Sequence, residues 1–209
     1  MTEPDPEEVN SRANEKAKKR KQARDKMLAT KTIEKGLLIV HTGKGKGKST
    51  AAFGLAARAI GNGLKVGIVQ YVKGKWETGE RVVMEAFSDQ VTIRTMGEGF
   101  TWETQDRARD IAAARAAWEA SKEMIEAARG EGGYDMVILD ELNIVLRYDY
   151  LPLDEVLAVL AAKPDDLHVI ITGRNAKPEL IEAADLVTEM TMIKHPFRAG
   201  VKAQKGIEF

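Results

Sequence analysis

Residues 41–50 carry the pattern best suited to chemistry, and they read HTGKGKGKST. Glycine-rich loops that end in Gly-Lys-Ser bind phosphates, because glycine lets backbone N–H groups approach an anion and the next helix presents its positive end. The usual spacing, G-x-x-x-x-G-K-[ST], would put the first glycine at position 42. Position 42 is Thr42 and the glycine is Gly43, so the loop is one residue short.

The neighbours of this loop favour a phosphate site over the alternative, a flexible basic loop. An apolar run over 37–40 predicts a buried strand before it, and residues 48–61 predict a helix after it. Lys48 is then expected to reach phosphate oxygens, and the Ser49 hydroxyl is expected to bind Mg²⁺.

A second acidic motif, MVILDE, has four apolar residues followed by Asp140 and Glu141. This is the form of a strand that delivers a carboxylate to the metal of a phosphate-loop enzyme. Alternatively, Asp140 is a cap and Glu141 is a solvated residue. Taken together with the loop, the motif predicts the remaining ligands of a magnesium site.

The elements that must position these residues alternate along the chain. Apolar runs predict strands, and patterns with a helical period predict helices. The further strands are expected over 64–72, 91–96, 134–141, 167–172 and 186–192. The further helices are expected over 103–129, 152–162 and 177–184. In the longest helix Ile111, Ala114, Trp118 and Ile125 fall on one face. We therefore expect an α/β, P-loop NTPase-like fold: a mostly parallel six-stranded sheet with helices on both faces and ligands beyond the carboxyl ends of its strands.

Composition divides the chain and excludes several kinds of site. Residues 1–34 form a basic arm, expected either to be a solvated tail or to order over the active site, and residues 35–209 form the domain. Without cysteine there is no disulfide, thiolate zinc site or iron–sulfur cluster. The chain has neither an apolar run long enough to span a membrane nor a signal-peptide pattern, so we expect a cytoplasmic protein.

Histidine offers little catalytic potential. We expect His41 to be packed at a strand end and His168 to be a sheet residue, while a ligand contact of His195 stays open.

The chain resembles one family closely, the P-loop ATP:corrinoid adenosyltransferases. The resemblance covers about residues 36–209, and its short loop and FTWET motif are highly specific. The motifs that carry it, in order, are TGKGKGKSTAAFGLAARAIG, VGIVQYVKG, GFTWETQ, VILDELN, YDYLPLDEV, VIITGRN and GVKAQKGIEF.

The resemblance implies a reaction. A corrinoid reduced to Co(I) attacks C5′ of ATP, the 5′-deoxyadenosyl group moves to cobalt, and tripolyphosphate leaves, in adenosylcobalamin biosynthesis or salvage. It also implies Mg²⁺ or Mn²⁺, a homodimer, a flavin-type reductant for Co(II), and ATP held in a reversed sense on the loop. The corrinoid is cobyrinic acid a,c-diamide, cobinamide or cobalamin.

The resemblance also implies residue roles. Glu141, with Asp140 second, corresponds to the metal-side carboxylate, and Lys48 acts in catalysis together with Phe100 and Trp102, the aromatic pair at the lower face of the corrinoid. Lys44 stands where the family often has an uncharged residue. The nucleotide-binding residues are Gly43, Lys44, Gly45, Lys46, Gly47, Lys48, Ser49 and Thr50.

Two other functions remain open at this point. A P-loop phosphotransferase or ATPase would release ADP or phosphate. A nucleic-acid-binding ATPase module would use the basic arm on the phosphate backbone, although no recognised nucleic-acid motif accompanies that arm, which makes a nucleic-acid partner the weaker expectation.

Overall fold

The computed structural model describes residues 6–72, 78–97 and 106–208. Phe100 and Trp102 therefore lie outside the described residues. The chain divides into two compact units, Met1–Glu34 and Lys35–Phe209.

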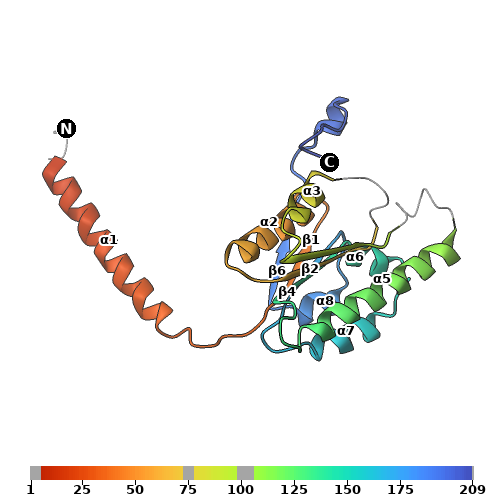
Figure 1. Ribbon diagram of the computed structural model, residues 1–209. Helices are drawn as coiled ribbons and strands as arrows, with labels where there is room; N and C mark the ends of the chain where they lie inside the picture. Colours follow the sequence, from red (N-terminus) through yellow and green to blue (C-terminus); the bar gives the residue numbers. More distant parts are fainter. Residues whose placement is uncertain (1–5, 73–77, 98–105, 209) are drawn as a thin grey trace. The chain divides into compact units, whose positions relative to one another are not determined.

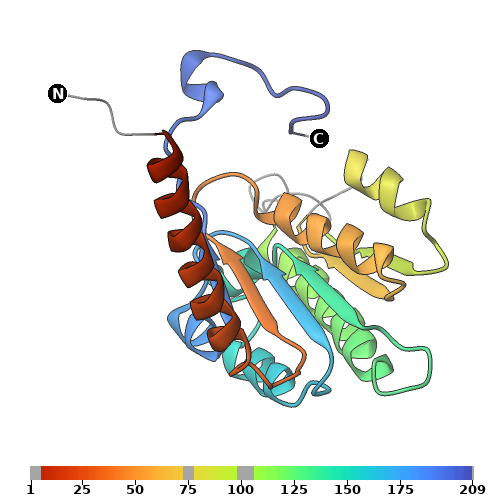
Figure 2. The same cartoon turned by 90° about the vertical axis from the view of Figure 1, so that its left-hand side faces the viewer.

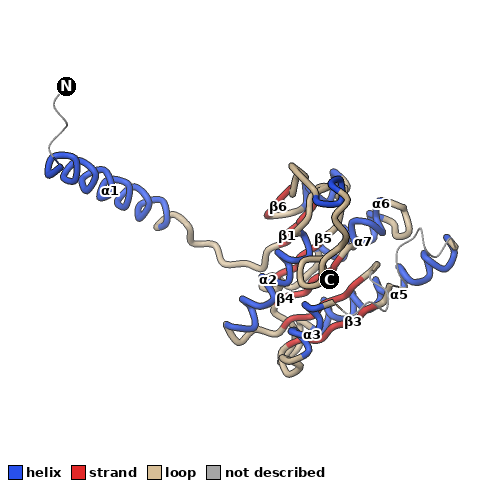
Figure 3. The backbone as a smooth tube through the Cα atoms, turned by 90° about the horizontal axis from the view of Figure 1, so that it is seen from above, coloured by secondary structure: helices blue, strands red, loops and turns tan. Residues whose placement is uncertain are grey.

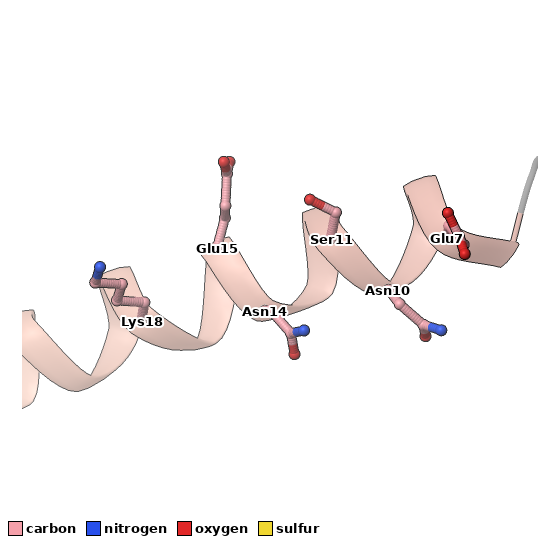
Figure 4. Close-up of a pocket in the computed structure, with 6 residues that line it drawn as sticks. All are labelled: Glu7, Asn10, Ser11, Asn14, Glu15 and Lys18. Carbon is pink, nitrogen blue, oxygen red and sulfur yellow. The ribbon is translucent and has the colours of Figure 1, made fainter.

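The first unit contains the helix α1 (Pro6–Leu28). Ala, Lys, Arg and Glu dominate its sequence, and these residues favour helix. Its described side chains are exposed, and Figure 4 shows polar ones projecting from successive turns. The helix has no apolar stripe of its own to bury.

The second unit is built on a six-stranded sheet with the order β3-β2-β4-β5-β1-β6. Every neighbouring pair of strands is parallel. The strands are β1 (Leu38–Thr42), β2 (Val66–Gln70), β3 (Val91–Thr95), β4 (Met136–Asp140), β5 (His168–Thr172) and β6 (Leu186–Glu189). The expected fold class is confirmed, with all six strands parallel.

Helices cover both faces of this sheet (Figures 1 and 2). One face packs α2 (Lys48–Gly61) and α3 (Gly79–Glu85) on a cluster that includes Phe53, Ile68 and Ile138. The other face packs α5 (Arg107–Ala127), α6 (Leu142–Arg147), α7 (Leu153–Ala161) and α8 (Pro178–Ala183). Because both faces are covered, every residue of β1, β2 and β4 is buried.

The long helix α5 presents the predicted face to the core. Ala114, Trp118 and Ile125 are buried and Ile111 packs beside them, so this prediction is confirmed. The sequence analysis missed α3, α6 and the short 3-10 helix η1 (Pro196–Ala199), which are too short to show a clear helical period.

After β6 the chain is mostly loop, drawn in tan in Figure 3. In the described part of the chain, no helix combines the length and the apolar character needed to cross a membrane.

Candidate functional site

The loop between β1 and α2 is shaped by its glycines. Gly43 and Gly47 have φ of 96° and 104°, a region that side-chain-bearing residues rarely adopt. A Cβ at Gly43 would lie 2.4 Å from the carbonyl oxygen of Met190. The N–H of Gly45 donates to that same oxygen over 2.6 Å. The loop therefore lies directly against the chain that follows β6.

The amino end of α2 is open to a ligand. Its N-cap, Gly47, makes no side-chain capping hydrogen bond, and the first N–H groups of a helix lack intrahelical acceptors. These N–H groups and the helix dipole favour an anion. Ser49 is half-buried and Thr50 exposed in this first turn, and the side chains of Lys44 and Lys46 are exposed in the loop.

Lys48 is the first residue of α2, and its side chain folds back onto the loop. It is 7% exposed, and its Nζ donates to the carbonyl oxygen of Gly45 over 2.5 Å. Burial lowers the pKa of the Lys48 ammonium, and the neighbouring positive charges of Arg174 and Lys46 lower it further, while the negative charge of Glu141 opposes them. Charges from three separate segments therefore converge on Lys48.

The acidic motif ends β4 and begins α6. Asp140, the last residue of the strand, is fully buried, and it accepts hydrogen bonds from Thr172 Oγ1 at 2.8 Å and from Gln70 Nε2 at 3.4 Å. Glu141 adopts a left-handed conformation, φ 70°, at the start of α6. This conformation is strained for a residue with a side chain. Its N–H donates to Thr172 Oγ1 over 2.9 Å.

These contacts belong to a row of polar residues across the carboxyl edge of the sheet. The strand register aligns Thr95 with Gln70, Gln70 with Asp140, and Thr172 with His41. Thr95 Oγ1 donates to Gln70 Oε1 over 2.9 Å, which extends the hydrogen bonds of Asp140 to an edge strand. We call Thr95, Gln70, Asp140, Thr172 and His41 the carboxyl-edge row.

Sequence reasoning missed most of this row, although a signal was present. The runs VGIVQ and VIIT each end in a polar residue after buried apolar ones. In a parallel sheet those final residues meet at one edge, so Gln70 and Thr172 could have been grouped with Asp140.

Each of the three histidines has a hydrogen-bonding or packing environment that the structure describes. His41 is buried at the end of β1, as expected, and neither ring nitrogen has a hydrogen-bond partner among the described residues. Burial lowers the pKa of its imidazole. His168, the first residue of β5, accepts from the N–H of Leu37, and His195 accepts from the N–H of Phe197.

The C-terminal segment reaches the same loop. Lys46 forms an ion pair with Glu208, whose side chain is 17% exposed. Together with the contacts of Met190, this pair lines the loop with residues that follow β6. The sequence analysis did not foresee this contact.

Ser49, Asp140 and Glu141 offer the donor set that a small hard cation requires. Mg²⁺ takes oxygen ligands, keeps several waters and usually needs only one or two carboxylates beside substrate phosphates. Among the described residues no group of three or more His, Cys, Asp or Glu side chains is gathered to hold a metal.

The described surface has a hollow away from the phosphate loop. It has a volume of about 730 Å³ and lies between α5 and α7, near the C-terminal ends of these two helices. Glu119, Lys122 and Arg129 are among the residues that line it. None of the residues that line it belongs to the loop.

Comparison with known proteins gives a consistent result. The family described as ATP:corrinoid adenosyltransferase BtuR/CobO/CobP matches residues 34–209. A corrinoid adenosyltransferase of Sinorhizobium sp is 57% identical over 97% of this chain and 94% of its own length. The corrinoid adenosyltransferase CobA of Salmonella typhimurium (strain LT2) is 46% identical over 96% of this chain and 99% of its own length.

Among solved structures, the flagellar accessory protein FlaH from Methanocaldococcus jannaschii aligns with a TM-score of 0.48 and 15% identity, covering 75% of this chain and 72% of its own.

Proposed function

Because this chain belongs to the family of ATP:corrinoid adenosyltransferases, we propose that its short phosphate loop holds ATP so that C5′ of the ribose, and not the γ-phosphorus, faces the nucleophile. The enzyme catalyses the ATP-dependent adenosylation of a corrinoid. The observation that carries the proposal is the loop itself, which leads from β1 directly into the open amino end of α2.

The one-residue deletion has a physical consequence. A kinase or ATPase must present the γ-phosphorus for attack, whereas an adenosyltransferase breaks the bond between C5′ and its oxygen. Gly43 and Gly45 pack against Met190, so the shortened loop has a fixed set of N–H directions. In our proposal those directions suit a triphosphate held as a leaving group, through Gly43, Lys44, Gly45, Lys46, Gly47, Lys48, Ser49 and Thr50.

Ser49, Glu141 and, second, Asp140 are the residues that would hold Mg²⁺ or Mn²⁺ in our proposal. The ion supplies charge neutralisation to the phosphates when it is bound. The hydrogen bonds that Asp140 accepts from Thr172 and Gln70 already occupy part of its carboxylate, which favours Glu141 as the carboxylate nearer the phosphates.

The chain's own residues have a limited task in this reaction. Co(I) in the substrate is itself a strong nucleophile and carries no proton to remove, so no general base is needed. Binding aligns C5′ with cobalt, and Lys48 and the loop N–H groups stabilise the charge that develops on the departing phosphate oxygen. The buried His41 takes no part in a proton transfer in this proposal.

Phe100 and Trp102, outside the described residues, are proposed to lie against the lower face of the corrinoid. Co(II) and Co(III) bind axial ligands and Co(I) prefers none. Apolar bulk that excludes water and the lower base therefore makes reduction to Co(I) easier.

The visible spectrum of the corrinoid tests the proposed function. Addition of the protein and MgATP to a Co(I) corrinoid should produce the spectrum of a cobalt–carbon bond. A phosphotransferase, an ATPase or a nucleic-acid-binding ATPase would leave the corrinoid spectrum unchanged while hydrolysing or transferring phosphate.

The biological setting is proposed from the family alone. It comprises a homodimer, a flavin-type reductant for Co(II), a cytoplasmic location, and cobyrinic acid a,c-diamide, cobinamide or cobalamin as the acceptor. The arm of residues 1–34 is proposed to cover the site. Deletion of residues 1–30 should then raise the corrinoid KM, and an unchanged KM would assign the arm to solvent.

A further inference from the structure

The turn that follows β5 brings an arginine beside the phosphate loop. Thr172 is in register with His41 of β1, and neighbouring strands lie about 4.8 Å apart. The residues after Thr172 and those after Thr42 therefore leave the sheet side by side. Arg174 is the second residue of the turn after β5.

Both sides of this turn are fixed to buried residues. The carbonyl oxygen of Gly173 accepts from Asn143 Nδ2 over 3.1 Å, and the N–H of Ala176 donates to Thr42 Oγ1 over 3.0 Å. Gly173 has φ 127°, and a Cβ there would lie 2.8 Å from the Cβ of Asn143. The backbone of Arg174 is thus held at the end of the very strand that carries the phosphate loop.

Arg174 adds a positive charge to the surroundings of Lys48. The two residues lie close enough for their charges to repel each other. Within the described ranges the Arg174 side chain makes no hydrogen bond or ion pair, and the residue is exposed. The negative charge of Glu141 offsets only part of this repulsion, and a bound polyanion lowers its cost further.

We propose that Arg174 is a further phosphate-binding residue of this enzyme, whose guanidinium binds the triphosphate of ATP beside Lys48 and stays with tripolyphosphate as it leaves. The inference deepens the proposed function and rests on it. A guanidinium presents two parallel N–H groups to phosphate oxygens, which a lysine cannot do. It would act on the leaving group, where negative charge develops in the transition state.

Titration calorimetry with inorganic tripolyphosphate tests the proposal without turnover. Arg174→Gln should weaken tripolyphosphate binding by about tenfold or more, the range expected for a charge-assisted contact. Arg174→Lys keeps the positive charge but lacks the two parallel N–H groups, and it should weaken tripolyphosphate binding less than Arg174→Gln does. Arg58→Gln is the matched control, because Arg58 is exposed near the far end of α2, ~15 Å along the helix from Lys48.

Two results would overturn the proposal. One is tripolyphosphate affinity of Arg174→Gln within twofold of the parent, and the other is a loss that Arg58→Gln reproduces. A raised corrinoid KM with unchanged tripolyphosphate affinity would reassign the arginine to the corrinoid, against the proposal. If circular dichroism shows that Arg174→Gln is unfolded, Arg174→Lys takes its place in the test. Undiminished affinity of Arg174→Lys for both tripolyphosphate and MgATP would then overturn the proposal. Formation of adenosylcorrinoid by the parent enzyme is measured separately. Failure of the proposed function can therefore be distinguished from failure of the Arg174 proposal.

Discussion

Thr172 Oγ1 donates a hydrogen bond to Asp140 Oδ1 over 2.8 Å and accepts one from the N–H of Glu141 over 2.9 Å. One buried hydroxyl on β5 therefore holds both Asp140, the last residue of β4, and Glu141, which follows it. The strained backbone of Glu141, φ 70°, is kept in place at a cost that this contact helps to offset.

Removal of the Thr172 hydroxyl should lower the stability of the protein and change the Mg²⁺ dependence of its rate. Thr172→Val removes one hydrogen bond from the buried carboxylate of Asp140 and one from the N–H of Glu141, which should cost about 1–3 kcal/mol of the free energy of unfolding. The displaced carboxylates should also raise the Mg²⁺ concentration needed for half-maximal rate. Urea denaturation and a Mg²⁺ titration of the rate measure the two effects.

Thr172→Ser retains the hydroxyl and should recover most of the Mg²⁺ dependence, and Thr188→Val on the exposed edge strand β6 serves as the control. If Thr172→Val needs the same Mg²⁺ concentration as the parent enzyme, Thr172 does not position the carboxylates that bind the metal.

Lys48 should contribute strongly to nucleotide binding. Charge-assisted contacts to phosphate are worth about 1.5–3 kcal/mol, so Lys48→Ala should weaken MgATP binding by roughly tenfold or more. Titration calorimetry gives the affinity, and Lys122→Ala on α5 removes the same charge from the outer surface. Unchanged MgATP affinity of a folded Lys48→Ala enzyme is incompatible with the assigned phosphate loop.

The ion pair between Lys46 and Glu208 should compete with phosphate. Lys46 is half exposed, and exposed pairs contribute about 0–1 kcal/mol. Glu208→Gln should accordingly increase tripolyphosphate affinity by up to about fivefold, because it frees Lys46 and removes a negative charge from the site. Glu182→Gln on the surface of α8 is the control. A weaker affinity of Glu208→Gln for tripolyphosphate would mean that the side-chain carboxylate of Glu208 assists phosphate binding.

Trp102 should matter most when cobalt must first be reduced. If it keeps water and the lower base from cobalt, Trp102→Ala should reduce turnover from Co(II) more than turnover from chemically prepared Co(I). Parallel assays with the two starting states measure the ratio. Equal losses in both assays would assign Trp102 to packing alone.

The sequence allowed the sheet and the phosphate loop to be predicted because their signals are local. Each buried strand is a short apolar run, and the Gly-Lys-Ser pattern lies between one such run and a helix. The carboxyl-edge row was harder, because its residues lie on separate strands and become neighbours only through the order β3-β2-β4-β5-β1-β6. Gln70 and Thr172 are single polar residues at strand ends, with no motif of their own.

Contacts between distant segments were likewise beyond the sequence analysis. Lys46 and Glu208 are joined only because the chain after β6 returns to the loop, and that segment is mostly irregular. Arg174 was visible in the motif VIITGRN, but its approach to Lys48 depends on the pairing of β5 with β1.

Phosphorus-31 NMR of a reaction between MgATP and a Co(I) corrinoid tests the central claim most directly. The loop and its cations are proposed to keep the three phosphates together while C5′ is attacked. We expect intact tripolyphosphate, formed one-for-one with the adenosylcorrinoid, and no ADP. Stoichiometric ADP and phosphate would contradict this claim, because they would show that the short loop still presents the γ-phosphorus for attack.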